Sequence, residues 1–195
     1  SAASAETFFY DNSLTALYGQ SYESTFGSDT DNVVLTFEHF SAHSWGDVFA
    51  FGDRVMEVEQ DGTSTYIEVA PRFKVSDFDA GIVKNVYLAT QWEMSEFDDN
   101  FLVGLGTDFN IPGFQNLSFN AYQRLNDDGD NNYQTTTVWG VPFAIAGQNF
   151  KFDGFWDWAT GTANGKAATS NFTYQLKWDA APTLGMTNKV YVGIE

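Results

Sequence analysis

Hydrophobic and polar residues alternate along nearly the whole chain, in segments of about ten residues. Segment 150–158 shows the pattern most clearly: one parity carries Phe150, Phe152, Trp156 and Trp158, and the other carries Lys151, Asp153, Phe155 and Asp157. A β-strand places alternate residues on opposite faces, and about ten residues is the length that a tilted strand needs to cross a bilayer. The pattern therefore predicts an all-β fold, an antiparallel up-and-down transmembrane β-barrel.

Alternation and turn composition together predict about eleven strands and no helix. The expected strands are Ser13–Gly19, Val33–Phe40, Asp47–Met56, Thr65–Phe73, Val83–Met94, Phe101–Ile111, Leu117–Leu125, Gln134–Phe143, Phe150–Trp158, Asn171–Trp178 and Lys189–Glu195. Short connections are expected at Ser41–Gly46, Ser76–Gly81, Pro112–Asn116 and Ala144–Gln148. Longer, polar or acidic ones alternate with them, at Gly19–Asn32, Val58–Ser64, Ser95–Asn100, Asn126–Asn132 and Thr160–Ser170. Short periplasmic turns and longer outer loops are typical of outer-membrane barrels.

Alternation alone also fits a soluble sandwich or a lipocalin-like barrel, whose apolar face lies inside. Strand length and the asymmetry of the connections favour lipid on the apolar side. So do the aromatic residues that end strands before short turns, where an interfacial girdle is expected. These are Phe73, Phe109, Phe143 and Trp178, and we expect them, with Trp156, to face outward.

The strand count bears on where the chain begins and ends. An odd number of strands leaves the first and last without a shared neighbour, whereas single-chain bacterial barrels have an even number. We therefore expect one barrel domain over residues 1–195 that lacks its closing C-terminal strand. The complete barrel is expected to have about twelve strands, of which roughly eleven are present here. The small residues at Ser1–Ala5 suit the end of a secretory signal, so an exported chain with its signal peptide removed is expected.

The composition of the chain indicates which classes of partner it suits. The chain has 195 residues with 9 Lys+Arg against 26 Asp+Glu, a net charge of −17, which makes nucleic acid an unsuitable partner. Aromatic residues make up 17% of it, more than most soluble domains carry, so apolar surface must be covered. No run of about eighteen apolar residues occurs, so no transmembrane helix is expected.

Several short motifs resemble a known family. They are Asp11-Asn12-Ser13-Leu14 with Leu17-Tyr18-Gly19, Thr36-Phe37-Glu38, Gly46-Asp47 with Phe49, Phe51 and Asp53, Glu68 with Pro71-Arg72-Phe73, Gly104, Gly106 and Asp108 before Ile111-Pro112-Gly113-Phe114, Trp139 with Pro142-Phe143, and Asp153-Gly154-Phe155 with Asp157-Trp158. Across nearly its whole length the chain resembles the nucleoside-specific channel-forming porins of the Gram-negative outer membrane, the Tsx-like family. The resemblance implies a monomeric barrel whose narrow lumen, lined by aromatic and ionisable groups, selects nucleosides. The departures are the missing closing strand and unusually acidic loops, and the latter leave the substrate open.

Both signs of charge fall on the polar parity, which the barrel turns toward its lumen. The ligand-binding residues we expect there are Phe49, Phe51, Asp53, Glu68, Arg72, Tyr87, Asp108, Arg124, Lys151, Asp153, Phe155 and Asp157. Interleaved acids and bases require either a wet channel or a closed network of ion pairs, and inward aromatic residues either stack on a base or fill space. Glu68 and Arg72 lie about 13 Å apart along one strand, so each is expected to meet an opposite charge on a neighbouring strand, Arg72 meeting Asp108 or Glu38 for example.

Other chemistry has little support. The acidic loop Asn126–Asn132 does not have the EF-hand spacing, so no metal and no cofactor is expected. There is no cysteine and no Gly-x-Ser-x-Gly elbow, and His39 and His43 beside Ser41 are a weak cue, so no enzyme is predicted.

The function predicted is passive uptake of small polar solutes, most of all nucleosides, through the bacterial outer membrane. The base would stack on Phe49, Phe51, Tyr87 and Phe155, and the sugar would meet Asp53, Arg124, Lys151 and Asp157. Outer-membrane lipid and lipopolysaccharide are the expected surroundings. The alternative is a non-conducting barrel whose acidic loops serve surface attachment or assembly with a partner.

Overall fold

The computed structural model describes residues 6–22, 30–58 and 62–195. Nearly all of them lie in strands, as alternation predicted. The strands are β1 (Thr7–Tyr22), β2 (Thr30–His43), β3 (Gly46–Glu57), β4 (Thr63–Ala80), β5 (Val83–Ser95), β6 (Asp99–Phe109), β7 (Asn116–Leu125), β8 (Asn132–Ile145), β9 (Gln148–Ala159), β10 (Thr169–Asp179) and β11 (Tyr191–Ile194).

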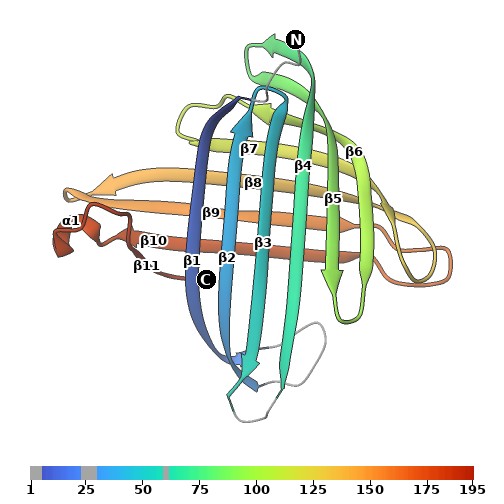
Figure 1. The fold of residues 1–195 in the computed structure, drawn as a ribbon, viewed down its shortest axis with the longest axis horizontal. Coiled ribbons are helices and arrows are strands. Elements are labelled where there is room, and N and C mark those ends of the chain that lie inside the picture. The colour runs from blue at the N-terminus through green and yellow to red at the C-terminus, as the bar shows by residue number, and fades with distance from the viewer. Residues whose placement is uncertain (1–5, 23–29, 59–61) are drawn as a thin grey trace. The chain divides into compact units, whose positions relative to one another are not determined.

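The strands form a single sheet in which each follows its neighbour in sequence, from β1 to β11 (Figure 1). The pairs β1–β2, β2–β3 and β3–β4 are antiparallel, as are β8–β9, β9–β10 and β10–β11. This up-and-down order confirms the predicted fold class. β1 and β11 stand at the two ends of the strand order, and the predicted absence of a closing strand stays a prediction.

The elements differ from those predicted most clearly in β4 and after β10. β4 runs on to Ala80, past Phe73, so the connection expected at Ser76–Gly81 shrinks to Gly81 and Ile82. A four-residue helix, α1 (Ala181–Leu184), lies where no helix was expected, and Gly185 ends it at φ 64°. Proline at the first turn suits a helix start and a left-handed glycine suits its end, and four residues are too few to show a helical period.

The described residues contain no helix long and apolar enough to span a membrane.

Contacts divide the chain into two compact units. Unit 1 comprises Ser1–Phe73, Ala89–Val103 and Arg124–Gly129, and unit 2 comprises Lys74–Leu88, Gly104–Gln123 and Asp130–Glu195. Each is described by itself below.

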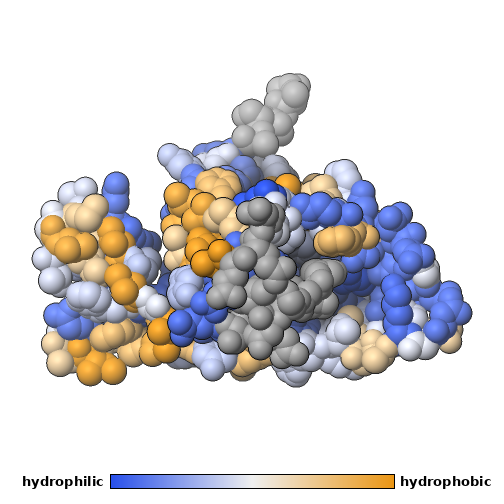
Figure 2. Space-filling view, turned by 90° about the horizontal axis from the view of Figure 1, so that it is seen from below, coloured by the Kyte–Doolittle hydropathy of each residue, from blue (hydrophilic) through white to orange (hydrophobic). Residues whose placement is uncertain are grey.

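The two faces of the sheet follow the predicted parity. On β5, Tyr87, Gln91 and Glu93 are buried, whereas Leu88 and Trp92, the residues of the other parity, are exposed. We name these the polar face and the apolar face. Exposed aromatic and aliphatic side chains of the apolar face, such as Phe37, Phe73 and Phe172, leave hydrophobic residues at the molecular surface, and hydrophobic patches show there in Figure 2.

Aromatic side chains pack against one another on the apolar face of β8, β9 and β10. The Trp139 ring stacks on Phe172 at 5.5 Å between centroids, and Phe143 stacks on Phe150, also at 5.5 Å. Such pairs stabilise neighbouring strands by roughly 0.5–1.5 kcal/mol each beyond the area they bury. A face this rich in exposed aromatic residues suits a hydrocarbon boundary.

Candidate functional site

In unit 1, β3 presents a row of acidic and aromatic residues on the polar face. Alternate positions carry Asp47, Phe49, Phe51 and Asp53, because a strand directs every second side chain to the same side. The Phe51 ring lies 5.8 Å from Phe49 and 5.6 Å from Tyr66 of β4, tilted against both. The Tyr66 hydroxyl in turn donates to Glu68 at 3.3 Å. Three rings and a carboxylate thus form one continuous surface.

Arg72 of β4 is held by Asp47, its partner in the strand register. Its Nε and Nη2 donate to the two carboxylate oxygens at 2.8 and 2.7 Å, and both side chains are about nine-tenths buried. Two parallel charge-assisted hydrogen bonds fix the guanidinium plane. The expectation that Arg72 meets an acid on a neighbouring strand is confirmed, but the acid is one that sequence analysis did not name. The parity that Asp47 shares with Phe49 and Phe51 was the signal that pointed to it.

A second ion pair in unit 1 joins Arg124 of β7 to Glu93 of β5. The two guanidinium nitrogens Nη1 and Nη2 reach the carboxylate oxygens at 3.2 and 2.6 Å. Gln91, two residues before Glu93, also donates to it at 3.1 Å. Glu93 is 6% exposed, so this charge persists because it is paired and hydrogen-bonded.

Unit 2 carries a mixed cluster on the polar face of β9 and β10. Lys151 and Lys177 both reach Oδ2 of Asp153, at 2.9 and 2.7 Å. The other oxygen, Oδ1, is buried and accepts no hydrogen bond from the described residues. The cluster has two cations and one anion, so it is locally positive in a chain of net charge −17. It presents two donors and one unused acceptor.

Phe155 and Asp157 extend that cluster along β9. The row Lys151, Asp153, Phe155, Asp157 therefore places an aromatic residue between two carboxylates, and the β3 row likewise has its aromatic residues between two carboxylates. Asp157 accepts a hydrogen bond from Thr136 of β8 at 2.5 Å. Successive members of such a row lie about 6.8 Å apart.

The remaining predicted residues also have polar partners. In unit 1, Asp53 accepts from the Thr36 hydroxyl at 2.6 Å. In unit 2, the Tyr87 hydroxyl donates to Asp108 at 2.7 Å and accepts from Asn85 at 3.2 Å. The twelve predicted residues thus divide between the units. Phe49, Phe51, Asp53, Glu68, Arg72 and Arg124 belong to unit 1, and Tyr87, Asp108, Lys151, Asp153, Phe155 and Asp157 to unit 2.

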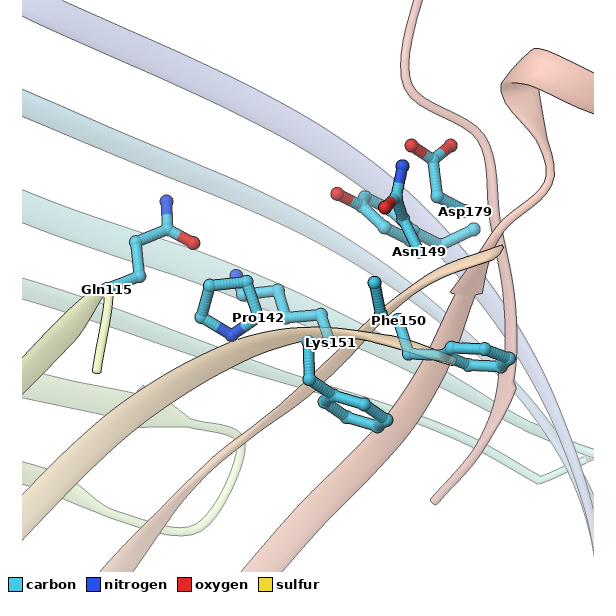
Figure 3. Close-up of a pocket in the computed structure, with 9 residues that line it drawn as sticks. Gln115, Pro142, Asn149, Phe150, Lys151 and Asp179 are labelled. Atoms are coloured by element: carbon cyan, nitrogen blue, oxygen red, sulfur yellow. The ribbon is translucent and has the colours of Figure 1, made fainter. Parts of the chain in front are cut away.

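A cavity of about 320 Å³ lies in unit 2 near the β8–β9 turn. Pro142 and Lys151, register partners on β8 and β9, lie side by side at its wall, with Gln115 and Asp179 toward opposite ends (Figure 3). Lys151 therefore borders the cavity while its ammonium group bonds Asp153. Lys151 is thus the member of the cluster that lines the cavity.

The connection between β5 and β6 holds one electrostatically perturbed group. Glu96 accepts the backbone N–H of Thr65 at 2.9 and 3.0 Å through its two oxygens. Hydrogen bonds from the backbone N–H groups of Thr65 and of Glu96 itself lower the pKa of this carboxyl below its ordinary value, and the charge of Arg54 adds to the effect. Glu96 thus links the β5–β6 connection to the start of β4.

Among residues 6–22, 30–58 and 62–195, no group of three or more His, Cys, Asp or Glu side chains is placed to hold a metal ion. Within the acidic segment Asn126–Asn132, Asn126 accepts a hydrogen bond from Arg124 Nε at 2.8 Å, and the Asp127 N–H donates to Asn100.

The comparison with protein families identifies the chain's relatives. The sequence model of the nucleoside-specific channel-forming protein, Tsx, matches residues 11–193. The chain belongs to the Tsx family. The match covers nearly all of the chain and agrees with the up-and-down antiparallel sheet. Among curated proteins, no sequence matches it.

Membership of the Tsx family places the chain among the channel-forming proteins of the outer membrane. The apolar face described above is the surface that such a protein turns to lipid.

Proposed function

We propose that this chain is a channel for passive uptake of nucleosides across the bacterial outer membrane, with the polar face of its strands lining the path. One observation carries the proposal: the polar faces of β3 and β9 both place aromatic rings two residues from carboxylates, Phe51 beside Asp53 and Phe155 beside Asp153 and Asp157. A nucleoside has the matching order, a flat base joined to a sugar with hydroxyl groups.

The β3 row offers a stacking surface for the base. Phe49, Phe51 and Tyr66 form a continuous aromatic surface with ring separations below 6 Å, and every nucleobase has a π-face that stacks on such a surface. Asp53 and Glu68, on the same face, are carboxylates and accept hydrogen bonds from sugar hydroxyls. Stacking tolerates any base, so this row predicts low selectivity among bases.

The β9 row offers a second subsite. A base on Phe155 would bring its sugar about 6.8 Å along the strand, toward the unused Oδ1 of Asp153 or toward Asp157. Lys151 and Lys177 would donate to acceptor oxygens on the same solute. Repeated weak subsites of one chemistry suit conduction, because a solute must leave each site as easily as it enters.

Exported processing, a monomeric state and contact with lipopolysaccharide belong to the same proposal. Membership of an outer-membrane channel family supports them, and each is testable on the purified protein by N-terminal sequencing, sedimentation and lipid analysis.

Single-channel recording in planar bilayers tests the function. We expect an ion current that adenosine or thymidine partly blocks. Substituting Phe51→Ala or Phe155→Ala should weaken the block about 5- to 140-fold in half-blocking concentration, the factor that corresponds to roughly 1–3 kcal/mol of stacking per base.

Phe37→Ala is the matched control, because Phe37 lies on the apolar face of β2, where its register partner is Gly52 of β3. The control should conduct and be blocked like the wild type. A folded protein that carries no current, with nucleosides leaving its behaviour unchanged, would overturn the channel and favour attachment or assembly through the acidic loops.

A further inference from the structure

One polar group in unit 1 breaks the alternation of the sheet. His39, Ser41 and His43 of β2 share a parity with Phe37, so they lie on the apolar face. Their neighbours there include Val48 and Pro71, register partners on β3 and β4, and Val48 is also the register partner of Ser41. A polar row on a surface turned to lipid has a cost in desolvation unless every group is hydrogen-bonded.

Every group in this row is bonded, in a chain of four contacts. Thr7 Oγ1 lies 3.0 Å from His43 Nδ1, and His43 Nε2 lies 2.9 Å from Ser41 Oγ. Ser41 Oγ lies 3.0 Å from His39 Nε2, and His39 Nδ1 lies 2.8 Å from the amide oxygen of Asn12. Both imidazoles therefore converge on the hydroxyl of Ser41, a residue that is 5% exposed.

The residues at the two ends of this hydrogen-bonded row, Thr7 and Asn12, determine which atom donates in each of its hydrogen bonds. The Asn12 oxygen only accepts, so His39 Nδ1 carries a hydrogen and its Nε2, in the neutral ring, accepts from the Ser41 hydroxyl. Ser41 Oγ then accepts from His43 Nε2–H, and His43 Nδ1 accepts from the Thr7 hydroxyl. All donors and acceptors match with both rings neutral, which suits a low-dielectric surface.

A backbone irregularity completes the arrangement. Asn12 and Thr7 have opposite sequence parity, and regular alternation would place them on opposite faces. A register shift between Thr7 and Phe9 sets two residues of β1 against one of β2, which turns Thr7 to the side of Asn12. Bulges of this kind re-aim side chains and are common next to active sites.

We propose that Ser41, His39 and Asn12 form a nucleophilic site that hydrolyses acyl esters of membrane lipids. A serine hydroxyl bonded to a histidine whose other nitrogen is oriented by a third group is the arrangement that activates serine in hydrolases on unrelated folds. His39 is the general base, and Asn12 is a positioning residue that holds the tautomer. His43 donates to Ser41 Oγ and is placed to stabilise negative charge that develops beside it.

A tryptophan beside the site indicates that it lies near the membrane boundary. Trp45, in the turn after β2, stacks on His43 at 5.0 Å between centroids and packs against Phe73 at 5.3 Å. Tryptophan marks the boundary between hydrocarbon and headgroups. Ser41 lies four residues before Trp45 in the chain, so the site is close to this boundary, which lipid ester groups also border.

The reaction balances with water as the co-reactant. Ser41 Oγ bonds to the ester carbonyl carbon while its proton passes to His39 Nε2, and the carbon–oxygen bond to the alcohol breaks as the alcohol takes that proton. Water then attacks the acyl carbon and gives a proton to His39. The Ser41–acyl bond breaks, the fatty acid leaves, and the proton returns to Ser41 Oγ.

The test uses the full chain, folded in detergent micelles and in vesicles. We expect a long-chain alkyl fluorophosphonate to add covalently to the peptide containing Ser41, and phosphatidylcholine in mixed micelles to release fatty acid. Ser41→Ala should lose both signals. Ser13→Ala is the matched control, since Ser13 lies on the opposite face of β1, bonded to Glu38 at 2.6 Å, and it should keep both.

Variants of the orienting residue separate positioning from folding. Asn12→Asp retains the acceptor and should keep labelling, whereas Asn12→Leu should slow it by about 100-fold, the lower range of a general base's contribution. Circular dichroism and heat-modified gel mobility identify folded variants. The proposal is wrong if folded wild type takes no label, if Ser41→Ala is labelled equally, or if Asn12→Leu reacts like Asn12→Asp. Nucleoside block of the current is independent of all three outcomes.

Discussion

Breaking the ion pair between Asp47 and Arg72 should destabilise unit 1 more than any exposed charge substitution. Arg72 Nε and Nη2 bind the two oxygens of Asp47 at 2.8 and 2.7 Å, and the side chains are 12% and 9% exposed. Asp47→Ala removes both hydrogen bonds and leaves a guanidinium largely away from bulk water. Loss of one partner of a fully buried pair costs 3–5 kcal/mol, and a hydrated polar face lowers this to about 3 kcal/mol.

Urea unfolding of the folded protein in vesicles, followed by tryptophan fluorescence, measures the effect. With a slope of about 3 kcal/mol per M, the expected loss lowers the midpoint by about 1 M. A double-mutant cycle with Arg72→Ala should yield a coupling of about 2 kcal/mol, because the second substitution removes the charge that the first left without its carboxylate.

Arg54→Ala provides the control within the same pair of strands. Arg54 is exposed and donates to the hydroxyls of Thr63 and Thr65 at 2.7 and 2.6 Å. Its loss should cost less than about 1 kcal/mol, as exposed polar pairs do. A coupling below about 0.5 kcal/mol between Asp47 and Arg72, or an equal loss in Arg54→Ala, would refute the reasoning.

Two further predictions concern pH and packing. Because hydrogen bonds from backbone N–H groups lower the pKa of Glu96 in the folded protein, its stabilising effect should be complete above the ordinary pKa of 4.5 and disappear as pH falls through the lower folded value. The difference in urea midpoint between wild type and Glu96→Ala should shrink to zero over that range, and a difference that grows on acidification would contradict the assignment. Gly154→Ala should cost roughly 1–3 kcal/mol, because the added carbon meets the Thr173 carbonyl oxygen and comes within 2.9 Å of the Trp139 ring. Gly52→Ala, whose added carbon meets nothing closer than 3.7 Å, should leave the urea midpoint nearly unchanged. Equal effects of the two substitutions would show that the close approach at Gly154 is relieved without loss of stability.

The two proposed functions use opposite faces of the sheet. Each strand offers one face to lipid and one to solute, so a single strand such as β2 serves both. Its polar face carries Glu38, and its apolar face carries Ser41 with two histidines. Solute recognition and ester chemistry can thus be altered separately.

The sequence by itself determined the strands and the faces. Each of the eleven predicted segments overlaps a strand, because a period of two is a local property that each segment displays without reference to the others. The same parity assigned Tyr87, Glu93 and Lys151 to the polar face and Phe73 and Trp156 to the apolar one. It did not reveal α1, because a helix of four residues is little more than one turn and shows no repeated helical period.

Only the tertiary structure decided which residues meet. The partner of Arg72 is Asp47 and not a residue named from the sequence, because the register of β3 against β4 depends on hydrogen bonds between segments far apart in the chain. In the same way Asn12 meets His39, and the shift near Thr7 brings that threonine to His43. Parity gives a residue's face, but register and bulges place it opposite a partner, and these follow from the energy of the whole sheet.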